Sequence, residues 1–187
     1  MLRSEHLSGL CRSVSRYLKG DKVTNTRKGG KSKSKNKKQH CYDHPRPSVS
    51  VDIVLFYQAA ERVEVLLIKR AGEPFKGQWA LPGGFVDEDE ALELAAAREL
   101  KEETGISGVR LAQIGAFGDP GRDPRGHTIS IAFGARVSKR AEAVGADDAE
   151  EARWQALARL PRLAFDHKKI IRTARERLLG SDKNKKG

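Results

Sequence analysis

The chain has 187 residues, 38% of them apolar, and a formal net charge of +11. This length allows one domain of ordinary size with tails, and no apolar run approaches the roughly 20 residues of a membrane-spanning helix. The two cysteines, Cys11 and Cys41, are too few for a disulfide framework and are typical of a reducing compartment. We therefore expect a cytoplasmic protein.

The positive charge is concentrated near the N-terminus. Residues 1–50 contain thirteen Lys and Arg against three Asp and Glu, a net of +10, which leaves +1 for the remainder. Apolar residues at 7, 10, 11, 14 and 18 follow helical spacing with basic residues opposite, which predicts an amphipathic helix. Such a helix suits an organelle-targeting segment or an anionic membrane surface, and the alternative is a transient helix without either role.

The lysine-rich stretch at residues 26–39 has almost no apolar side chains, so we expect it to be disordered. Nonspecific contact with nucleic-acid phosphates is an alternative to a simple solvated tail. The expected organisation is a basic tail at 1–46, a globular domain at 47–180 and a short polar tail at 181–187.

Strands and helices are expected to alternate irregularly through the domain, which favours α/β or α+β layers. Two strands joined by a hairpin come first, at 48–57 and 63–68, and a short strand at 79–81 ends at a Pro-Gly-Gly turn. A helix at 88–104 follows, and the later elements are strands at 109–117, 128–137 and 152–155 and a helix from about 166.

The predicted helix at 88–104 has recognisable end signals. Asp87 is a candidate N-cap with Glu90 three residues later, as in a capping box, and Gly105 is placed to end the helix. Leu92, Ala96 and Leu100 repeat every four residues and predict its buried stripe.

Three glutamates share one face of this helix. Glu99, Glu102 and Glu103 stand at i, i+3 and i+4, within an arc of about 100°. Like charges at this spacing repel, and a hard divalent cation such as Mg²⁺ or Mn²⁺ relieves the repulsion. The preceding glycine turn lets backbone approach a ligand, so the carbonyl of Gly83 is a further candidate ligand. The alternative is a solvated acidic face.

Residues 84–106, GFVDEDEALELAAARELKEETGI, resemble the Nudix box. Every defined position of that motif is filled, by Gly84, Glu90, Arg98, Glu99, Leu100, Glu102, Glu103, Gly105 and Ile106. The resemblance implies an α/β/α sandwich around a mixed β-sheet over about residues 48–180. It also implies that Glu99, Glu102 and Glu103 bind two or more Mg²⁺ or Mn²⁺ ions with substrate, and that Arg98 orients the helix through Glu90.

A further carboxylate is expected as a base or an extra metal ligand. Glu151 precedes a predicted strand and matches the position where many Nudix enzymes place such a group. Asp147 and Asp148 are rivals for this role, and a solvated acidic loop is the alternative.

The segment at residues 117–127, FGDPGRDPRGH, resembles a loop of ADP-ribose pyrophosphatases, as do residues 73–86 and 163–167. The implied reaction is hydrolysis of ADP-ribose to AMP and ribose 5-phosphate. Arginine offers a planar fork to phosphate oxygens, so Arg122 and Arg125, with Asp123 and Gly84, are candidate substrate contacts. Trp79 would either stack on adenine or belong to the core. Many relatives are homodimers, which the sequence leaves open.

Three other functions remain. One is a Nudix enzyme for nucleoside triphosphates or dinucleoside polyphosphates, and another is RNA decapping with the lysine-rich tail as the RNA contact. The third is an ADP-ribose sensor with a DNA-binding winged helix, for which the residues after Asp166 are too few.

Overall fold

The structure is a computed structural model that describes residues 42–60, 62–140 and 149–180. Chain contacts separate Met1–Pro45 from the unit Arg46–Gly187. The predicted N-terminal helix, the lysine-rich stretch, Asp147 and Asp148 lie outside the described residues. Among those described, no helix is both long and apolar enough to cross a membrane.

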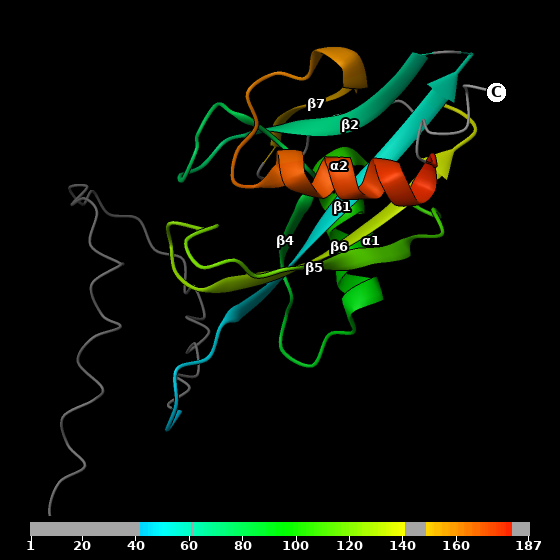
Figure 1. The fold of residues 1–187 in the computed structure, drawn as a ribbon. Coiled ribbons are helices and arrows are strands. Elements are labelled where there is room, and N and C mark those ends of the chain that lie inside the picture. Colours follow the sequence, from blue (N-terminus) through cyan, green and yellow to red (C-terminus); the bar gives the residue numbers. More distant parts are fainter. Residues whose placement is uncertain (1–41, 61, 141–148, 181–187) are drawn as a thin grey trace, which may run out of the picture. The chain divides into compact units, whose positions relative to one another are not determined.

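Seven strands form one mixed sheet (Figure 1). They are β1 (Ser48–Ala59), β2 (Arg62–Arg70), β3 (Trp79–Ala80), β4 (Gly83–Phe85), β5 (Ala112–Phe117), β6 (Thr128–Val137) and β7 (Ala149–Ala156). The order is β3-β2-β1-β6-β5, while β4 pairs with β1 and β7 pairs with β2. The β1–β6 pair is parallel and the other pairs are antiparallel.

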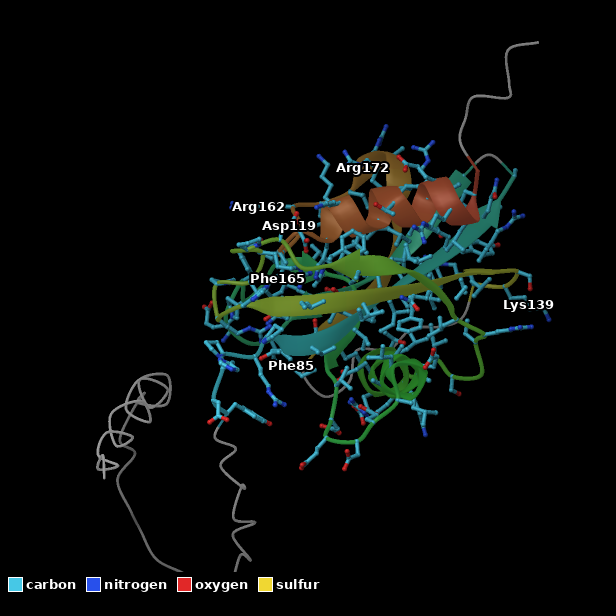
Figure 2. All side chains as sticks on the ribbon, turned by 60° about the horizontal axis from the view of Figure 1, so that its bottom comes forward. Phe85, Asp119, Lys139, Arg162, Phe165 and Arg172 are labelled. Carbon is cyan, nitrogen blue, oxygen red and sulfur yellow. The ribbon has the colours of Figure 1, made fainter. Side chains whose placement is uncertain are left out.

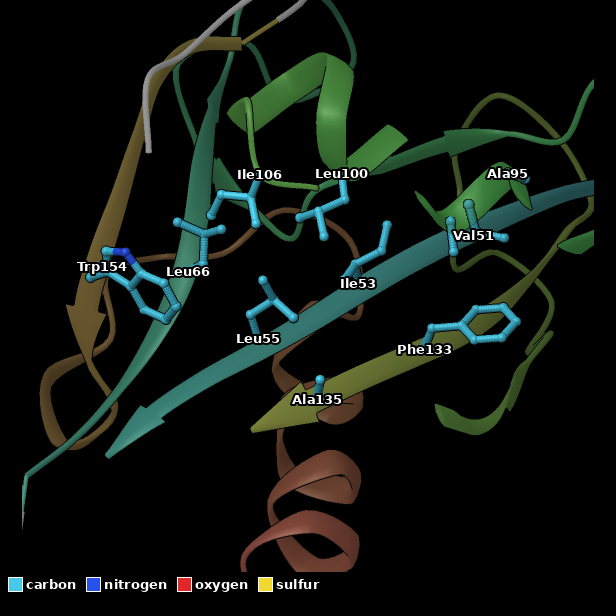
Figure 3. Packing of buried hydrophobic residues seen from close by; sticks show 11 residues of the cluster. Val51, Ile53, Leu55, Leu66, Ala95, Leu100, Ile106, Phe133, Ala135 and Trp154 are labelled. Atoms are coloured by element: carbon cyan, nitrogen blue, oxygen red, sulfur yellow. The ribbon is translucent and has the colours of Figure 1, made fainter. Parts of the chain in front are cut away.

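Two helices cover the two faces of the sheet, α1 (Leu92–Thr104) and α2 (His167–Leu178). Side chains of β1 alternate between them, because successive residues of a strand point to opposite faces. Ile53 packs in one core cluster with Leu100 of α1, as Figure 3 shows, and Val54 packs in the other with Ile170 of α2. The predicted α/β/α sandwich is confirmed. A short 3-10 helix, η2 (Leu157–Arg159), follows β7.

The expected start of the first helix was wrong. The helix begins at Leu92 after Ala91, which provides no side-chain cap, and Asp89 has a φ of 61° that interrupts a helix before that point. Glu90 does accept the N–H of Asp87, over 3.0 Å, as a capping box would. Its carboxylate also binds Arg98, so Glu90 holds a turn beside the helix.

The other expected boundaries differ by a few residues, except that β4 was not foreseen. Gly83 and Gly84, expected as a turn, form this short strand against β1, with Gly83 opposite Asp52. Glycines give no alternating apolar pattern, so this pairing left no signal in the sequence. A Cβ atom at position 83 would lie 2.1 Å from the carbonyl oxygen of Val51, so only glycine fits so close to β1.

Candidate active site

The three glutamates of α1 face different surroundings. Glu99 and Glu103 line a cavity that is also bordered by β1, β2 and the glycine strand β4, whereas Glu102 does not. The side chain of Glu102 is 45% exposed, against 13% for Glu99. The sequence-predicted triad therefore presents two carboxylates to the cavity, while the third is more exposed to solvent.

Glu103 is buried and fixed by the glycine strand. Its Oε2 atom accepts the backbone N–H of Gly83 over 2.8 Å. Burial raises the pKa of Glu103 to about 8, and the Gly83 hydrogen bond only partly offsets that effect. Gly83 thus contacts Glu103 through its N–H group, whereas the sequence suggested its carbonyl as a metal ligand.

Glu99 rests directly on Gly84. A Cβ atom at position 84 would lie 2.3 Å from Oε1 of Glu99, so the absence of a side chain creates the space for this carboxylate. Burial raises the pKa of Glu99, and the Arg98 hydrogen bond acts in the opposite direction. Each glycine of the turn therefore serves one carboxylate of α1.

Arg98 relieves much of the repulsion among these carboxylates. It donates to Glu90 over 2.8 Å, to Glu99 over 2.7 Å and to Glu102 over 3.1 Å. It also donates to the carbonyl of Phe85 over 3.1 Å. The expected Arg98–Glu90 ion pair is present. The same guanidinium also reduces the repulsion between the glutamates, an effect that the sequence had suggested for a metal ion.

The donor set suits a hard divalent cation. Among the described residues, no three His, Cys, Asp or Glu side chains are arranged to close around an ion. Glu99 and Glu103, however, both line the cavity and have raised pKa values, so each gains by facing a cation. Oxygen ligands of this kind are those that Mg²⁺ and Mn²⁺ prefer.

The cavity has a volume of about 320 Å³ and a mixed lining. Carboxylates lie along α1, and arginines lie along β2 and the loop before β6. The polar and aromatic side chains of its lining are Ser50, Asp52, Arg70, Glu73, Phe85, Glu99, Glu103, Arg122, Asp123, Arg125, Phe165 and His167. Acidic groups for a cation and basic groups for an anion therefore share one space.

Arg125 forms the outer wall of this cavity. Its guanidinium lies 4.8 Å from the ring centroid of Phe85 and 5.6 Å from that of Phe165, and Figure 2 shows both rings toward the same end of the sheet. It pairs with Asp123 over 2.8 Å, yet 42% of the Arg125 side chain stays exposed. Arg125 is fixed in orientation and still accessible to an anion.

The NUDIX domain profile matches residues 46–174. The chain belongs to the Nudix family. It is 47% identical over 136 residues to the ADP-ribose pyrophosphatase of Methanocaldococcus jannaschii, covering 73% of this chain and 76% of that protein. It is 36% identical to the ADPR responsive transcriptional repressor NtrR of Acinetobacter baylyi, but spans only 56% of that relative.

A solved Nudix structure shares this fold. The NUDIX domain of Shewanella oneidensis NrtR, in complex with ADP ribose, superposes with a TM-score of 0.67 at 37% identity. The match covers 73% of this chain and 93% of that domain.

Arg122, expected to contact substrate, is largely taken up within this Nudix domain. Its side chain is only 5% exposed, and it pairs with Asp166 over 2.6 Å and with Asp52 over 3.4 Å. These bonds tie the 117–127 segment to β1 and to the start of α2. The structure brings Arg122 to the cavity wall, but with most of its donors already occupied.

Two other expected residues lie away from the cavity. Trp79 is half-buried on β3, packs against the core cluster beneath α2 and is not among the cavity's lining residues. Glu151 lies on β7 opposite Lys69 and pairs with Arg153. Its neighbour Ala152 faces inward, so Glu151 points to the other face of the strand. The structure does not bring Glu151 to Glu99 and Glu103.

Asp52, Ser130 and His167 form a buried cluster that was not predicted from the sequence. Burial raises the pKa of Asp52, but His167, Ser130 and Arg122 lower it more, and the net shift is downward. Asp52 could have been recognised as the one carboxylate within the apolar sequence of β1, because a buried charge requires partners. Ser130 and His167 gave no comparable signal, because their partnership depends on strands and helices that are distant in sequence.

Proposed function

We propose that this chain hydrolyses the diphosphate bond of ADP-ribose, with Mg²⁺ or Mn²⁺, to give AMP and ribose 5-phosphate. The observation that carries the proposal is the cavity in which the carboxylates of α1 and the guanidinium of Arg125 share one space. A bridging diphosphate needs both cationic neutralisation and a fixed site for metal ions. The similarity to an ADP-ribose pyrophosphatase supports the same substrate.

The carboxylates would hold the ions. Glu99 and Glu103 line the cavity, and Glu102 would join them by turning from Arg98, whose bonds to Glu90 keep it in place. When bound, such ions neutralise diphosphate oxygens and promote attack by water. Two or more ions are expected from the family resemblance.

The arginines would hold the anionic substrate. Arg125 presents an exposed guanidinium whose plane is fixed by Asp123 and two aromatic rings. Arg70 also lines the cavity, and its Nε donates to the carbonyl of Pro74 over 2.8 Å. A planar fork held in this way loses little entropy on binding phosphate. Arg122 would act mainly by fixing the loop that carries Arg125.

The decisive experiment is a product assay. The full chain is incubated with ADP-ribose, a nucleoside triphosphate, a dinucleoside polyphosphate and capped RNA, with Mg²⁺, with Mn²⁺ or with chelator. We expect AMP and ribose 5-phosphate from ADP-ribose, and none in chelator. Absence of these products at every metal concentration would overturn the proposal.

The RNA-directed alternative depends on the basic N-terminal segment. A variant lacking residues 1–45 distinguishes RNA decapping from ADP-ribose hydrolysis. It removes the unit Met1–Pro45 and leaves the unit Arg46–Gly187 intact. We expect its ADP-ribose turnover to match that of the full chain. Light scattering on the same samples decides whether the protein is a homodimer.

A further inference from the structure

The carboxylate of Asp52 lies where three segments meet, namely β1, the 117–127 segment and the 163–167 segment. Asp52, in the middle of β1, is 7% exposed and accepts the hydroxyl of Ser130. Its Oδ1 atom lies 3.3 Å from Nε2 of His167, and its Oδ2 atom lies 3.4 Å from Arg122. None of these partners belongs to the Nudix box, yet Asp52 and His167 both line the same cavity as Glu103.

The geometry fixes the tautomer of His167. The backbone N–H of Leu81 donates to Nδ1 of His167 over 2.9 Å. A nitrogen that accepts this bond carries no proton, so the ring proton lies on Nε2, which faces Asp52. By binding the protonated Nε2, Asp52 leaves Nδ1 free to accept a hydrogen bond. A carboxylate often fixes the tautomer of a histidine in this way.

The turn that begins at Leu81 connects His167 to α1. Leu81 is followed by Pro82 and then by Gly83, whose N–H donates to Glu103 over 2.8 Å. The carbonyl of Pro82 accepts the N–H of Ile53 over 2.8 Å, which fixes the same turn from the side of β1. The first residue of α2 is thus connected, through one turn, to the buried glutamate of α1.

We propose that His167 is a positioning residue that holds the 81–84 turn and, through Gly83, sets the carboxylate of Glu103 for metal binding. This inference rests on the proposed function only in assuming that the bound ion serves ADP-ribose hydrolysis. His167 makes no hydrogen bond or ion pair with Glu99 or Glu103 and acts through Leu81. Outer partners that orient metal ligands in this way typically contribute about 10- to 100-fold to metal affinity.

Packing alone does not account for this histidine. His167 is 3% exposed and its ring centroid lies 5.2 Å from that of Phe165, a space that a phenylalanine ring would also fill. Phenylalanine, however, offers no acceptor to the buried N–H of Leu81, and an unpaired buried N–H is costly. A substitution that preserves the acceptor is therefore the informative one.

The test uses three variants of the full chain. In H167N the amide oxygen can occupy the place of Nδ1, whereas in H167Q the amide reaches toward Asp52 and in H167F no acceptor remains. Amide exchange of Leu81 is followed by NMR, and Mn²⁺ binding by electron paramagnetic resonance. We expect H167N to keep Leu81 protection and Mn²⁺ affinity, and H167Q and H167F to lose protection and bind Mn²⁺ about tenfold or more weakly.

Unchanged Leu81 protection and Mn²⁺ affinity in H167Q and H167F would overturn the inference, as would H167N losing both as severely as H167F. If H167Q and H167F fail to fold, the ring ¹⁵N shifts of His167 in the unaltered protein decide the matter. A proton on Nδ1 would refute the proposed bond, and a proton on Nε2 would support it. None of these measurements requires turnover, so failure of ADP-ribose hydrolysis is recognised separately.

Discussion

The carboxylate of Glu99 occupies the space that a side chain on Gly84 would fill, since a Cβ atom there would lie 2.3 Å from Oε1. The obstructed atom is the end of a flexible side chain, which can move. Gly83 differs, because its Cβ atom would meet the backbone oxygen of Val51 at 2.1 Å and its φ is 153°. Two adjacent glycines are thus required for different reasons, Gly84 to leave space for the Glu99 carboxylate and Gly83 to allow the pairing of β4 with β1.

We therefore expect Gly84→Ala to displace Glu99 and weaken Mn²⁺ binding about tenfold or more, while the melting temperature changes little. Gly83→Ala should instead lower the melting temperature, because backbone cannot yield as a side chain does. Calorimetric titration with Mn²⁺ and thermal unfolding of both variants check this. Equal metal affinity in Gly84→Ala and the unaltered protein would contradict the role of Gly84.

Glu103→Gln should reduce turnover of ADP-ribose by at least about 100-fold, since a direct ligand should matter more than an outer one. Folding should be retained, because the amide oxygen of the introduced glutamine can still accept the N–H of Gly83. Glu93→Gln, an exposed position in the first turn of the same helix, is the matched control. Steady-state kinetics at saturating Mg²⁺ measure both, and comparable rates would defeat the metal-site assignment.

The two arginines of the 117–127 segment should behave differently. Arg122→Ala breaks buried ion pairs with Asp52 and Asp166, so we expect a loss of about 3 kcal/mol or more in unfolding free energy. Arg125→Ala should mainly raise KM for ADP-ribose, by roughly tenfold, as expected for loss of a charged hydrogen bond. Urea unfolding and kinetics separate the effects, and an unchanged KM in Arg125→Ala would remove that residue from the substrate site.

Glu90 gives a dependence of stability on pH. Its hydrogen bond with Arg98 lowers the pKa of Glu90 from 4.5 to about 2 in the folded chain. The stabilisation from this pair is therefore complete above pH 4.5 and is lost as the pH falls toward 2. The difference in unfolding free energy between the unaltered protein and Glu90→Gln should therefore become smaller as the pH falls from 4.5 to about 2. A difference that does not vary with pH would contradict the assignment.

Glu151→Gln should retain most of the turnover, because Glu151 pairs with Arg153 away from the cavity. The rate at several Mg²⁺ concentrations, set beside that of Glu103→Gln, measures this. A loss as large as that of Glu103→Gln would restore Glu151 as the base that the sequence suggested.

The sequence predicted those parts of the site that depend on local spacing. Glu99, Glu102 and Glu103 share a helix face because of their separation alone, and the Nudix box identified Arg98 and Glu90 as partners. The network around Asp52 was not predictable in this way. Leu81 and His167 are 86 residues apart, and their bond exists only after α2 has docked on the sheet. The parallel pairing of β1 with β6 likewise follows from tertiary structure and from no local pattern.

The place of His167 at the start of α2 has a consequence for synthesis of the chain. A ribosome that has completed β1, the glycine strand and α1 has already made every carboxylate of the cluster, but not the residue that anchors the turn beside them. A nascent or C-terminally shortened chain should therefore gather divalent ions poorly. Uptake of divalent ions by such a chain would then report that α2 has been made and has docked on the sheet.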